Sequence, residues 1–354
     1  MTTPGPANRE IERRNRPYRA WTAAVCAALS LLVITAFSWP IVLPGPERPE
    51  PVSLHPSTDS EGAATLLGAL WLPRTTPDGS PFRGLSGLAW SGDDQLLYAI
   101  SDFGWLYHLR PEFRDGRLVN LEFVSAMKLT DRQARPLSGQ WADAEGLIAL
   151  EKSAHGQHET RLVVSFERHP RIQEFDTQGL FKKDHPLPPP YNTASRYSER
   201  NYALEAVAFL PQHGLLSAPE RPLRGAPAHA TEIFFLNGQR FDYPLSPDKN
   251  CGLVAAEPQT ENQLFIMERC YAGGRMVIAL RQVEFLTENS ATLEPRTLAR
   301  WDTLDGWLLD NFEGLTRVGE NTYLAISDDN GQDRQRTLLV YFRVNNPVAH
   351  RETP

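Results

Sequence analysis

The sequence predicts an all-β fold, a β-propeller of five blades, and two repeated features indicate it. A short phrase of small and apolar residues returns five times, and each copy is followed, after a polar turn, by a second apolar run ending in an acid. A period of about 45 to 60 residues with strand-like segments is typical of propeller blades. The 24 glycines and 29 prolines fall mainly between the apolar runs, as expected for short strands joined by tight turns.

The repeats divide the chain into units of four strands. The recurring phrase forms the first strand of each unit: SGLAW at 86–90, EGLIAL at 145–150, EAVAF at 205–209, CGLVAA at 251–256 and EGLTRV at 313–318. The acids that follow the second strands are Asp102, Glu167, Glu220, Glu268 and Asp328.

The fifth unit lacks one strand, and the segment TLLGALWL at Thr65 to Leu72 can supply it. A strand taken from the opposite end of the chain would close the ring and cover strand edges that are otherwise exposed. A sixth blade hidden in 131–143 or 184–201 is the alternative count. A β-sandwich with coincidental similarity between its strands is the alternative fold.

The chain ahead of the propeller has three parts. Residues 1–19 are polar and basic, 20–43 are almost entirely apolar, and 44–64 form a proline-rich linker. The apolar run exceeds the roughly 18 residues that a bilayer core demands, so it predicts one hydrophobic helix, either a signal anchor or a signal peptide cleaved after Ala36 or Ser38. The propeller then spans 65–346, with a tail at 347–354.

The basic flank of the apolar run predicts which side of the membrane each part occupies. Positive residues stay in the cytoplasm, so the remainder would be exported. The propeller is expected in the periplasm, anchored to the inner membrane by the helix or released there after cleavage. The net charge of −7 and the lack of a basic stripe argue against a nucleic-acid partner.

Cys251 and Cys270 flank the predicted hairpin of the fourth unit. The hairpin places them opposite each other, and in an exported protein such a pair predicts a disulfide. Two free buried thiols are the alternative. A metal pair is less favoured because no CxxC motif or paired histidines accompany them.

The recurring acids predict a site at one end of the central channel. The start of the first strand and the end of the second strand of a blade lie side by side, because the two strands are antiparallel neighbours. Carboxylates crowded there raise one another's pKa and need a compensating positive charge. The candidates for a Ca²⁺ site and for catalysis are Glu145, Glu205, Glu313 and Asp328.

Three arginines and one histidine follow the second-strand acids. Arg168, Arg221 and Arg269 are candidates for binding phosphate oxygens, since guanidinium matches them in bidentate geometry. His169 is a candidate proton donor. A structural role is the alternative: the acids would accept backbone hydrogen bonds from the next blade, and the arginines would lock them in place.

Several chemistries lack their motifs. GLSGL at 84–88 is not a nucleophile elbow, because Leu88 replaces the final glycine, so Ser86 is a weak candidate nucleophile. The chain contains no HExxH, P-loop or dinucleotide fingerprint, so no organic cofactor is expected. Zinc is disfavoured because the histidines are not clustered.

Together, the motifs SGLAW…LLYAISD, DAEGL, FERHPRI, LEAVAF and NFEGL…YLAISDDNG resemble the phytase-like family, also described as having esterase-like activity of phytase. The resemblance extends from about Leu67 to Val344. It implies an exported bacterial β-propeller that hydrolyses phosphate or carboxylate esters. The matched functional positions that it implies are Glu145, Arg168, Glu205, Glu313 and Asp328.

Two functions follow as hypotheses. The first is a metal-assisted hydrolase of a phosphorylated or otherwise esterified small molecule, with a lactonase as a close variant. The second is a non-catalytic propeller that presents one face to a ligand or a protein partner. The two differ in whether the channel acids converge on an ion beside a pocket or pair with neighbouring arginines.

Overall fold

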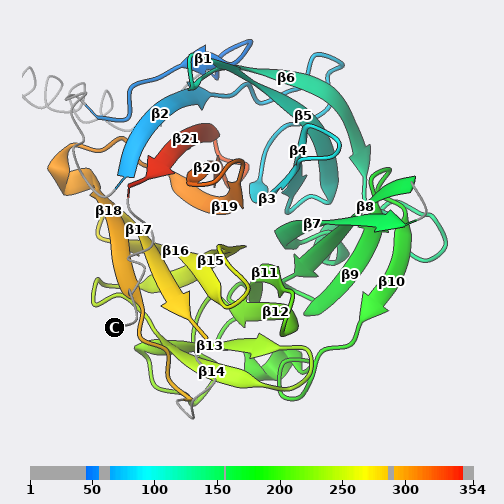
Figure 1. The fold of residues 1–354 in the computed structure, drawn as a ribbon, viewed down its shortest axis with the longest axis vertical. Coiled ribbons are helices and arrows are strands. Elements are labelled where there is room, and N and C mark those ends of the chain that lie inside the picture. The colour runs from blue at the N-terminus through cyan, green and yellow to red at the C-terminus, as the bar shows by residue number, and fades with distance from the viewer. Residues whose placement is uncertain (1–44, 56–63, 155–156, 286–290, 346–354) are drawn as a thin grey trace, which may run out of the picture. The chain divides into compact units, whose positions relative to one another are not determined.

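Five antiparallel sheets surround a central axis, each with its first strand innermost (Figure 1). This computed structural model describes residues 45–55, 64–154, 157–285 and 291–345. The innermost strands β3 (Leu85–Ser91), β7 (Ala144–Ala154), β11 (Leu204–Leu210), β15 (Cys251–Pro258) and β19 (Asn311–Arg317) contact one another in succession around the ring. The fold is therefore the predicted five-bladed β-propeller, not a six-bladed ring or a sandwich.

The remaining strands follow outward in chain order in the first four blades. Blade 1 continues with β4 (Leu96–Ser101), β5 (Trp105–Arg114) and β6 (Arg117–Lys128), and blade 2 with β8 (Gln157–Phe166), β9 (Arg171–Asp176) and β10 (Phe181–His185). Blade 3 continues with β12 (Gly214–Pro219), β13 (Ala230–Phe235) and β14 (Arg240–Pro244), and blade 4 with β16 (Gln263–Ala272), β17 (Arg275–Glu284) and β18 (Arg296–Asp302).

Blade 5 combines strands from both ends of the described chain. It contains β20 (Thr322–Asp328) and β21 (Leu338–Val344), and β2 (Ala64–Trp71) pairs antiparallel with β21 from Ala64 opposite Val344 to Trp71 opposite Leu338. This is the pairing that the sequence predicts for Thr65 to Leu72. Leu70 has no exposed surface and joins the apolar core between blades 5 and 1.

Part of the segment expected to be a linker belongs to the same sheet. Strand β1 (Glu50–Pro51) pairs with the outer edge of β2, and the Val52 amide donates to Ala69 O over 3.0 Å. Leu54 is 4% exposed and packs into the core between blades 4 and 5. These apolar residues anchor the segment, because burying them removes apolar surface from water.

The glycines of the recurring phrase allow the innermost strands to approach closely. A Cβ added at Gly87 would lie 2.6 Å from Glu145 O of the next blade, and one at Gly146 would lie 2.7 Å from Glu205 O. A side chain at either position would therefore push neighbouring blades apart. The "EG" of the repeat places an acid directly beside this contact.

The predicted hydrophobic helix at 20–43 and the predicted tail at 347–354 lie outside the described residues. Within the described part of the chain, no helix combines the length and the apolarity needed to cross a bilayer. The short helices found there are 3-10 turns of three residues each, at Gly139–Trp141, Ala194–Arg196 and Thr303–Asp305.

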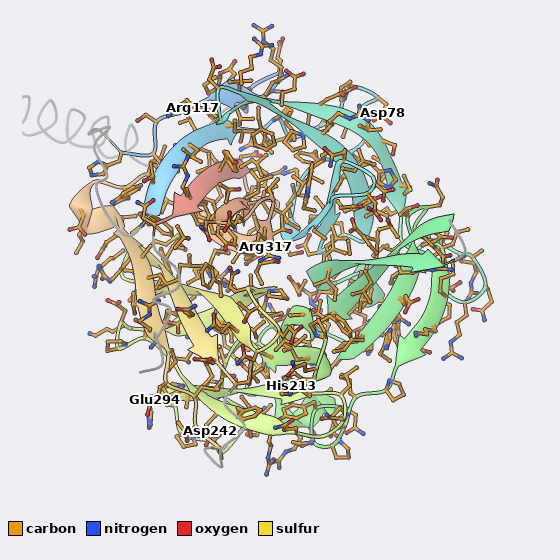
Figure 2. All side chains as sticks on the ribbon, viewed as in Figure 1. Asp78, Arg117, His213, Asp242, Glu294 and Arg317 are labelled. Atoms are coloured by element: carbon orange, nitrogen blue, oxygen red, sulfur yellow. A yellow bond between two sulfur atoms is a disulfide. The ribbon has the colours of Figure 1, made fainter. Side chains whose placement is uncertain are left out.

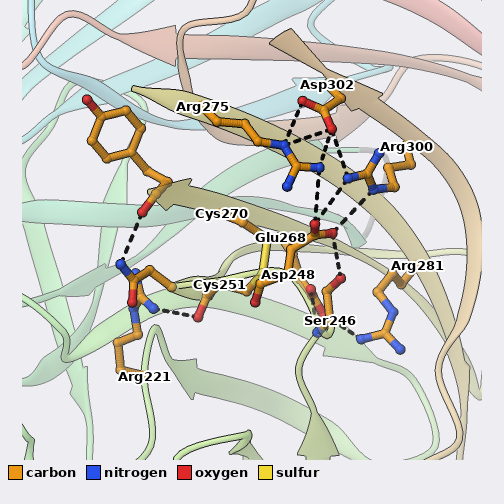
Figure 3. Close-up of a disulfide and its surroundings, with 12 residues drawn as sticks. Arg221, Ser246, Asp248, Cys251, Glu268, Cys270, Arg275, Arg281, Arg300 and Asp302 are labelled. Atoms are coloured by element: carbon orange, nitrogen blue, oxygen red, sulfur yellow. Dashed lines mark hydrogen bonds and ion pairs between the residues drawn. A yellow bond between two sulfur atoms is a disulfide. The ribbon is translucent and has the colours of Figure 1, made fainter. Parts of the chain in front are cut away.

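The predicted disulfide is present. Cys251 and Cys270 face each other in the β15–β16 ladder and are bonded, closing a loop with a sequence separation of 19 (Figure 3). Both residues are buried at 4% and 2% exposure.

Replacing Cys251 and Cys270 together with alanine should lower the free energy of unfolding by about 3 kcal/mol, because the crosslink restricts the unfolded chain. Chemical denaturation in the presence and absence of a reductant would measure this. The matched control is Cys26→Ala, which should unfold like the parent. An equal stability of the double variant and the oxidised parent would contradict the stabilising role.

Candidate functional site

The recurring acids lie at one end of the channel, where the innermost strands begin. Glu145, Glu205 and Glu313 occupy the starts of β7, β11 and β19 and are 8%, 6% and 9% exposed. Their charges act on one another: the charges of Glu205 and Glu313 raise the pKa of Glu145, and the charge of Glu313 raises the pKa of Glu205. Asp328 ends β20 and interacts electrostatically with Glu313. The structure therefore brings the four predicted metal ligands into one cluster.

The tightest group in this cluster includes two acids outside the predicted ligand set. Oxygen atoms of Asp143, Glu145 and Glu167 all lie within 4.8 Å of one another. Asp143 and Glu167 are 6% and 5% exposed, and the Glu167 amide donates to Asp143 O over 3.0 Å. We call these three residues the carboxylate triad. The motif DAEGL contains two of its members, Asp143 in the connection just before β7 and Glu145 at the start of the strand.

Burial and mutual repulsion shift the pKa values of this group. Burial, followed by the charges of Glu205 and Glu167, raises the pKa of Glu145 well above its ordinary value. Burial and the charge of Asp143 raise the pKa of Glu167 to about 9. Groups with such pKa values hold protons at neutral pH unless a cation binds among them.

Arg269 supplies a positive charge to the other half of the cluster. Its guanidinium hydrogen-bonds to Glu313 and donates from Nη2 to Glu220 over 3.3 Å. Its side chain is 15% exposed. The predicted role of Arg269 in binding phosphate does not fit this position, because both terminal nitrogens are engaged within the protein.

The register of blade 4 explains how Arg269 reaches the channel. In blade 3, Leu204 precedes a bulge and faces Pro219, one residue before the acid Glu220. In blade 4, Leu253 precedes the corresponding bulge and faces Glu268, so Arg269 occupies the position of Glu220. Successive side chains of a strand point to opposite faces. The acid of blade 4 stands one residue earlier in its strand than Glu220 does, so Arg269 points into the channel and Glu268 into the blade.

The sequence predicts Glu268 as a channel acid, and the structure shows that this prediction is wrong. It has no exposed surface and accepts hydrogen bonds from Tyr243 Oη at 2.6 Å, Arg281 at 2.7 Å and the Ser246 amide at 2.9 Å (Figure 3). Nearby, Arg275 and Arg300 pair with Asp248 and Asp302 at the edge of the same blade. Both sets are fully paired and hold blade 4 together.

The acids of the SDDNG stretch have separate roles. Asp328 accepts from the Asn330 amide at 2.7 Å and from Asn311 Nδ2 at 3.4 Å. Burial, followed by the charge of Glu313, raises its pKa well above the ordinary value. Asp329 instead accepts from Arg83 at 2.9 Å and from the Gly84 amide at 3.1 Å, so it ties blade 5 to blade 1.

The other two predicted arginines have different surroundings. Arg168 Nε lies 3.0 Å from Asp143 Oδ2, and its side chain is 48% exposed, so much of its guanidinium remains open to a ligand. Arg221 donates to Cys251 O over 2.7 Å and lies 3.3 Å from Glu220, which leaves it less free.

The histidine and the serine of the site also have defined contacts. His169 stacks on Trp141 with ring centroids 3.8 Å apart, and burial holds its pKa below the ordinary value, so it is neutral at pH 7. The hydroxyl of Ser86 donates to Ala144 O of the next blade. This bond gives Ser86 a structural role and not that of a nucleophile.

A polar cavity of about 970 Å³ adjoins the acids on the side of blades 3 to 5. Glu220, Arg269 and Asn311 form its contact with the cluster, and Tyr202, Tyr271 and Arg334 lie among its other walls. Tyr271 is 54% exposed. The cavity offers hydrogen-bonding groups and aromatic faces next to the carboxylates, as a binding site for a small polar molecule requires.

The donor atoms fit a hard cation such as Ca²⁺. Eight carboxyl groups surround the end of the channel, and three guanidinium groups accompany them. The acids are Asp102, Asp143, Glu145, Glu167, Glu205, Glu220, Glu313 and Asp328, and the arginines are Arg168, Arg221 and Arg269. Asp102 Oδ1 is buried and receives no hydrogen bond from the described residues, and Asp143 Oδ2 is buried with Arg168 Nε at 3.0 Å. Oxygen ligands without nitrogen or sulfur favour calcium or magnesium over zinc.

The chain belongs to the phytase-like family, because the family described as "Esterase-like activity of phytase" matches residues 80–331. The matched range includes the triad and every acid of the cluster. No curated protein matches the chain.

Solved structures of propellers resemble this chain at low identity. A gluconolactonase from Xanthomonas campestris is 15% identical, with 86% of this chain and 87% of that chain covered and a TM-score of 0.38. The Dos1 propeller is 10% identical, with 80% and 74% covered and a TM-score of 0.34. The propeller domain of Cps50 (Swd1) from Myceliophteria thermophila is 8% identical, with 85% and 100% covered and a TM-score of 0.36.

Removing the positive charge of Arg269 should destabilise the protein in a pH-dependent way. Arg269→Gln leaves Glu220 and Glu313 without their shared partner, which costs about 3 to 5 kcal/mol for a buried pair. The loss should be largest near pH 8 and smaller near pH 5, because protonated carboxyls no longer need the guanidinium.

Denaturant unfolding at both pH values measures the effect of Arg269→Gln. The control Arg168→Gln removes an arginine that is 48% exposed and should cost less than about 1 kcal/mol. A loss that is the same at pH 5 and pH 8 would contradict the electrostatic explanation.

Stability without metal should fall as pH rises. The pKa of Asp102 is raised to about 8 and that of Glu167 to about 9, chiefly by burial, so the folded state keeps protons that the unfolded chain releases near pH 4. The free energy of unfolding in EGTA should therefore decline from about pH 4 to about pH 9, and Ca²⁺ should restore it at the upper end.

Glu145→Gln tests whether Glu145 is a Ca²⁺ ligand by removing its ionisable group. Glutamine cannot ionise, so folding of the variant no longer requires this side chain to take up a proton at pH 8. The variant should therefore melt higher than the parent at pH 8 in EGTA and should lose most of the increase caused by Ca²⁺. Thermal melts measure both effects, with the exposed Glu122→Gln as the control. A variant that melts lower and still responds fully to Ca²⁺ would exclude Glu145 as a ligand.

Proposed function

We propose that the protein is an exported, metal-assisted hydrolase that cleaves phosphate or carboxylate esters, including lactones, of a small molecule. The observation that carries this proposal is the carboxylate triad, which is buried and undercompensated. A polar cavity of about 970 Å³ reaches the same cluster of acids at Glu220 and Arg269. A site built only for stability would pair each acid with a nearby cation, as Glu268 is paired with Arg281.

Asp143, Glu145 and Glu167 are the proposed ligands, with Asp102 beside them. Glu313 and Glu220 are less available because Arg269 occupies them. A bound Ca²⁺ would polarise the ester and lower the pKa of a water molecule. The cation would also allow the triad to ionise at neutral pH.

Glu205 is the proposed acid–base group. It lies among Glu145, Glu167 and Glu220, and burial raises its pKa well above the ordinary value. Its carboxylate would take a proton from the attacking water as the new bond to carbon or phosphorus forms. The same proton would pass to the oxygen of the alcohol as the ester bond breaks, so the enzyme returns to its starting state.

Arg168 and His169 border the triad from blade 2. The half-exposed guanidinium of Arg168 can bind an anionic oxygen of the substrate. Nε2 of His169 is buried without a hydrogen-bond partner among the described residues, and the ring is held by Trp141. A neutral, fixed imidazole can donate a hydrogen bond to the leaving oxygen. Tyr202 and Tyr271 would contact the organic part of the substrate in the cavity.

Export to the periplasm is part of the proposal. The basic and apolar N-terminal sequence supports it, and so does the disulfide, because such bonds form in oxidising compartments. The hydrophobic segment would anchor the protein in the inner membrane, or its cleavage would release the propeller.

The proposal is tested by metal analysis and by hydrolysis of p-nitrophenyl phosphate, p-nitrophenyl acetate and a δ-lactone. We expect bound calcium and activity on at least one substrate. Glu145→Gln should lower activity at least about 100-fold and reduce bound calcium, whereas Glu205→Gln should lower activity within the 10²- to 10⁴-fold range of acid–base catalysis and retain the calcium.

Glu122→Gln, which changes a charge on the outer strand β6, serves as the control and should behave like the parent. A protein that contains no metal, does not respond to EGTA and hydrolyses none of the esters would overturn the proposal. The acids would then be structural, and the propeller would be a non-catalytic binding module.

A further inference from the structure

The opposite end of the channel contains a second cavity, of about 620 Å³. The C-terminal halves of innermost strands form it, together with Phe209 of β11. Glu151 lines this cavity and follows Glu145 by six residues on β7, which corresponds to about 20 Å along a strand. The cavity is therefore separate from the carboxylate triad.

The walls of this second cavity combine polar groups with apolar side chains and include two aromatic residues. Trp90 of β3 and Phe209 of β11 line it, with Ile148 and Leu150 of β7 between them in the order of the blades. Phe209 is 37% exposed although it lies on an innermost strand. The Trp90 amide donates to Thr316 Oγ1 of β19 over 3.0 Å, so the backbone that carries the indole is fixed to the neighbouring blade.

Negative charge dominates the polar groups of the second cavity. Glu151, Glu257 and Glu320 line it, against the single guanidinium of Arg317. Arg317, which lies near the axis in Figure 2, donates to Gln259 O over 3.0 Å and is held at the rim. Glu151 Oε1 accepts from Ser91 Oγ at 2.7 Å and from the Asp93 amide at 3.0 Å, so this oxygen already has two donors.

Glu257 is different from the other two acids. Among the described residues, no lysine, arginine or histidine side chain lies within 4.0 Å of its carboxylate. Burial raises the pKa of Glu257 to about 8, and the charge of Arg317 and a hydrogen bond from its backbone amide act in the opposite direction. A cation that enters the cavity would stabilise the ionised form of such a carboxyl group.

We propose that this second cavity binds an alkylammonium group, with Glu257 as its counter-charge and the faces of Trp90 and Phe209 against its methyl or methylene groups. An ammonium ion near aromatic rings is attracted by their negative faces, and its alkyl part gains from apolar contact. An anion would face three carboxylates. Among the described residues, the three carboxylates do not form a group with oxygens within 4.8 Å of one another, so they are too dispersed to hold a bare metal ion. This site is independent of the proposed hydrolase.

Choline and its uncharged analogue 3,3-dimethylbutan-1-ol test the proposal, because they share shape and differ in charge. Calorimetric titration of the full-length protein in a non-ionic detergent should give binding of choline at least about tenfold tighter than of the alcohol. Glu257→Gln should remove this preference. Glu122→Gln, the same change on the outer strand β6, should keep it.

Two further variants make the result interpretable. Phe209→Leu removes an aromatic face from a partly exposed position and should weaken choline binding about threefold or more, even if Glu257→Gln does not fold. Glu145→Gln alters the triad and should leave choline binding unchanged, so failure of the hydrolase proposal would not affect this one.

The source of the ammonium group is settled by a peptide with one trimethyllysine, compared with the same peptide carrying norleucine. Binding of both choline and the methylated peptide indicates that a protein side chain can enter, and binding of choline alone indicates a free small molecule. No choline binding, equal binding of choline and the alcohol, or an unchanged preference in Glu257→Gln would overturn the proposal.

Discussion

The close contact of five innermost strands around one axis determines most of what this protein can do. The contact requires glycine at Gly87 and Gly146, where any Cβ would collide with the backbone of the next blade. These strands all start at the same end of the channel. The residues that precede the glycine position in the different blades therefore lie close to one another. In three blades that neighbouring residue, or its equivalent, is glutamate: Glu145, Glu205 and Glu313.

Such a ring of carboxylates raises the free energy of the folded state unless positive charge lies close to it. In this protein the positive charge is distributed unevenly around the ring. Arg269 enters the channel from blade 4 and holds Glu220 and Glu313. The opposite half, with Asp143, Glu145 and Glu167, has the half-exposed Arg168 at its edge, and the charge of Arg171 also acts on Asp143. The half that Arg269 compensates can serve a structural role. The less compensated half is where a bound cation would lower the electrostatic free energy most.

The two ends of the channel differ in chemistry although the same strands build both. The strand starts carry acids, and long connections that contain Trp141 and Tyr202 surround them. The strand ends carry Trp90 and Phe209 with fewer acids. About 20 Å of packed strand separates the ends. One scaffold can therefore hold two sites that bind different ligands without sharing a residue.

The sequence alone determined the propeller, the number of blades, the disulfide between Cys251 and Cys270, and the set of strands that brings acids to one end. These follow from local patterns, because apolar periodicity, turn residues and repeat spacing are properties of neighbouring residues. The grouping of Glu145, Glu205, Glu313 and Asp328 also followed, since it depends only on which end of a strand each acid occupies.

Only the tertiary structure decided which acids are free. In the β15–β16 ladder Arg269 takes the position that Glu220 has in blade 3, so Glu268 lies inside blade 4 and Arg269 enters the channel. Asp143 joins the triad through the connection that leads into β7, and Asp329 pairs with Arg83 of a distant loop. Register and loop path depend on long-range packing, and an offset of one residue exchanges the two faces of a strand. The sequence pattern is the same in either register, so it could not distinguish the paired acids from the free ones.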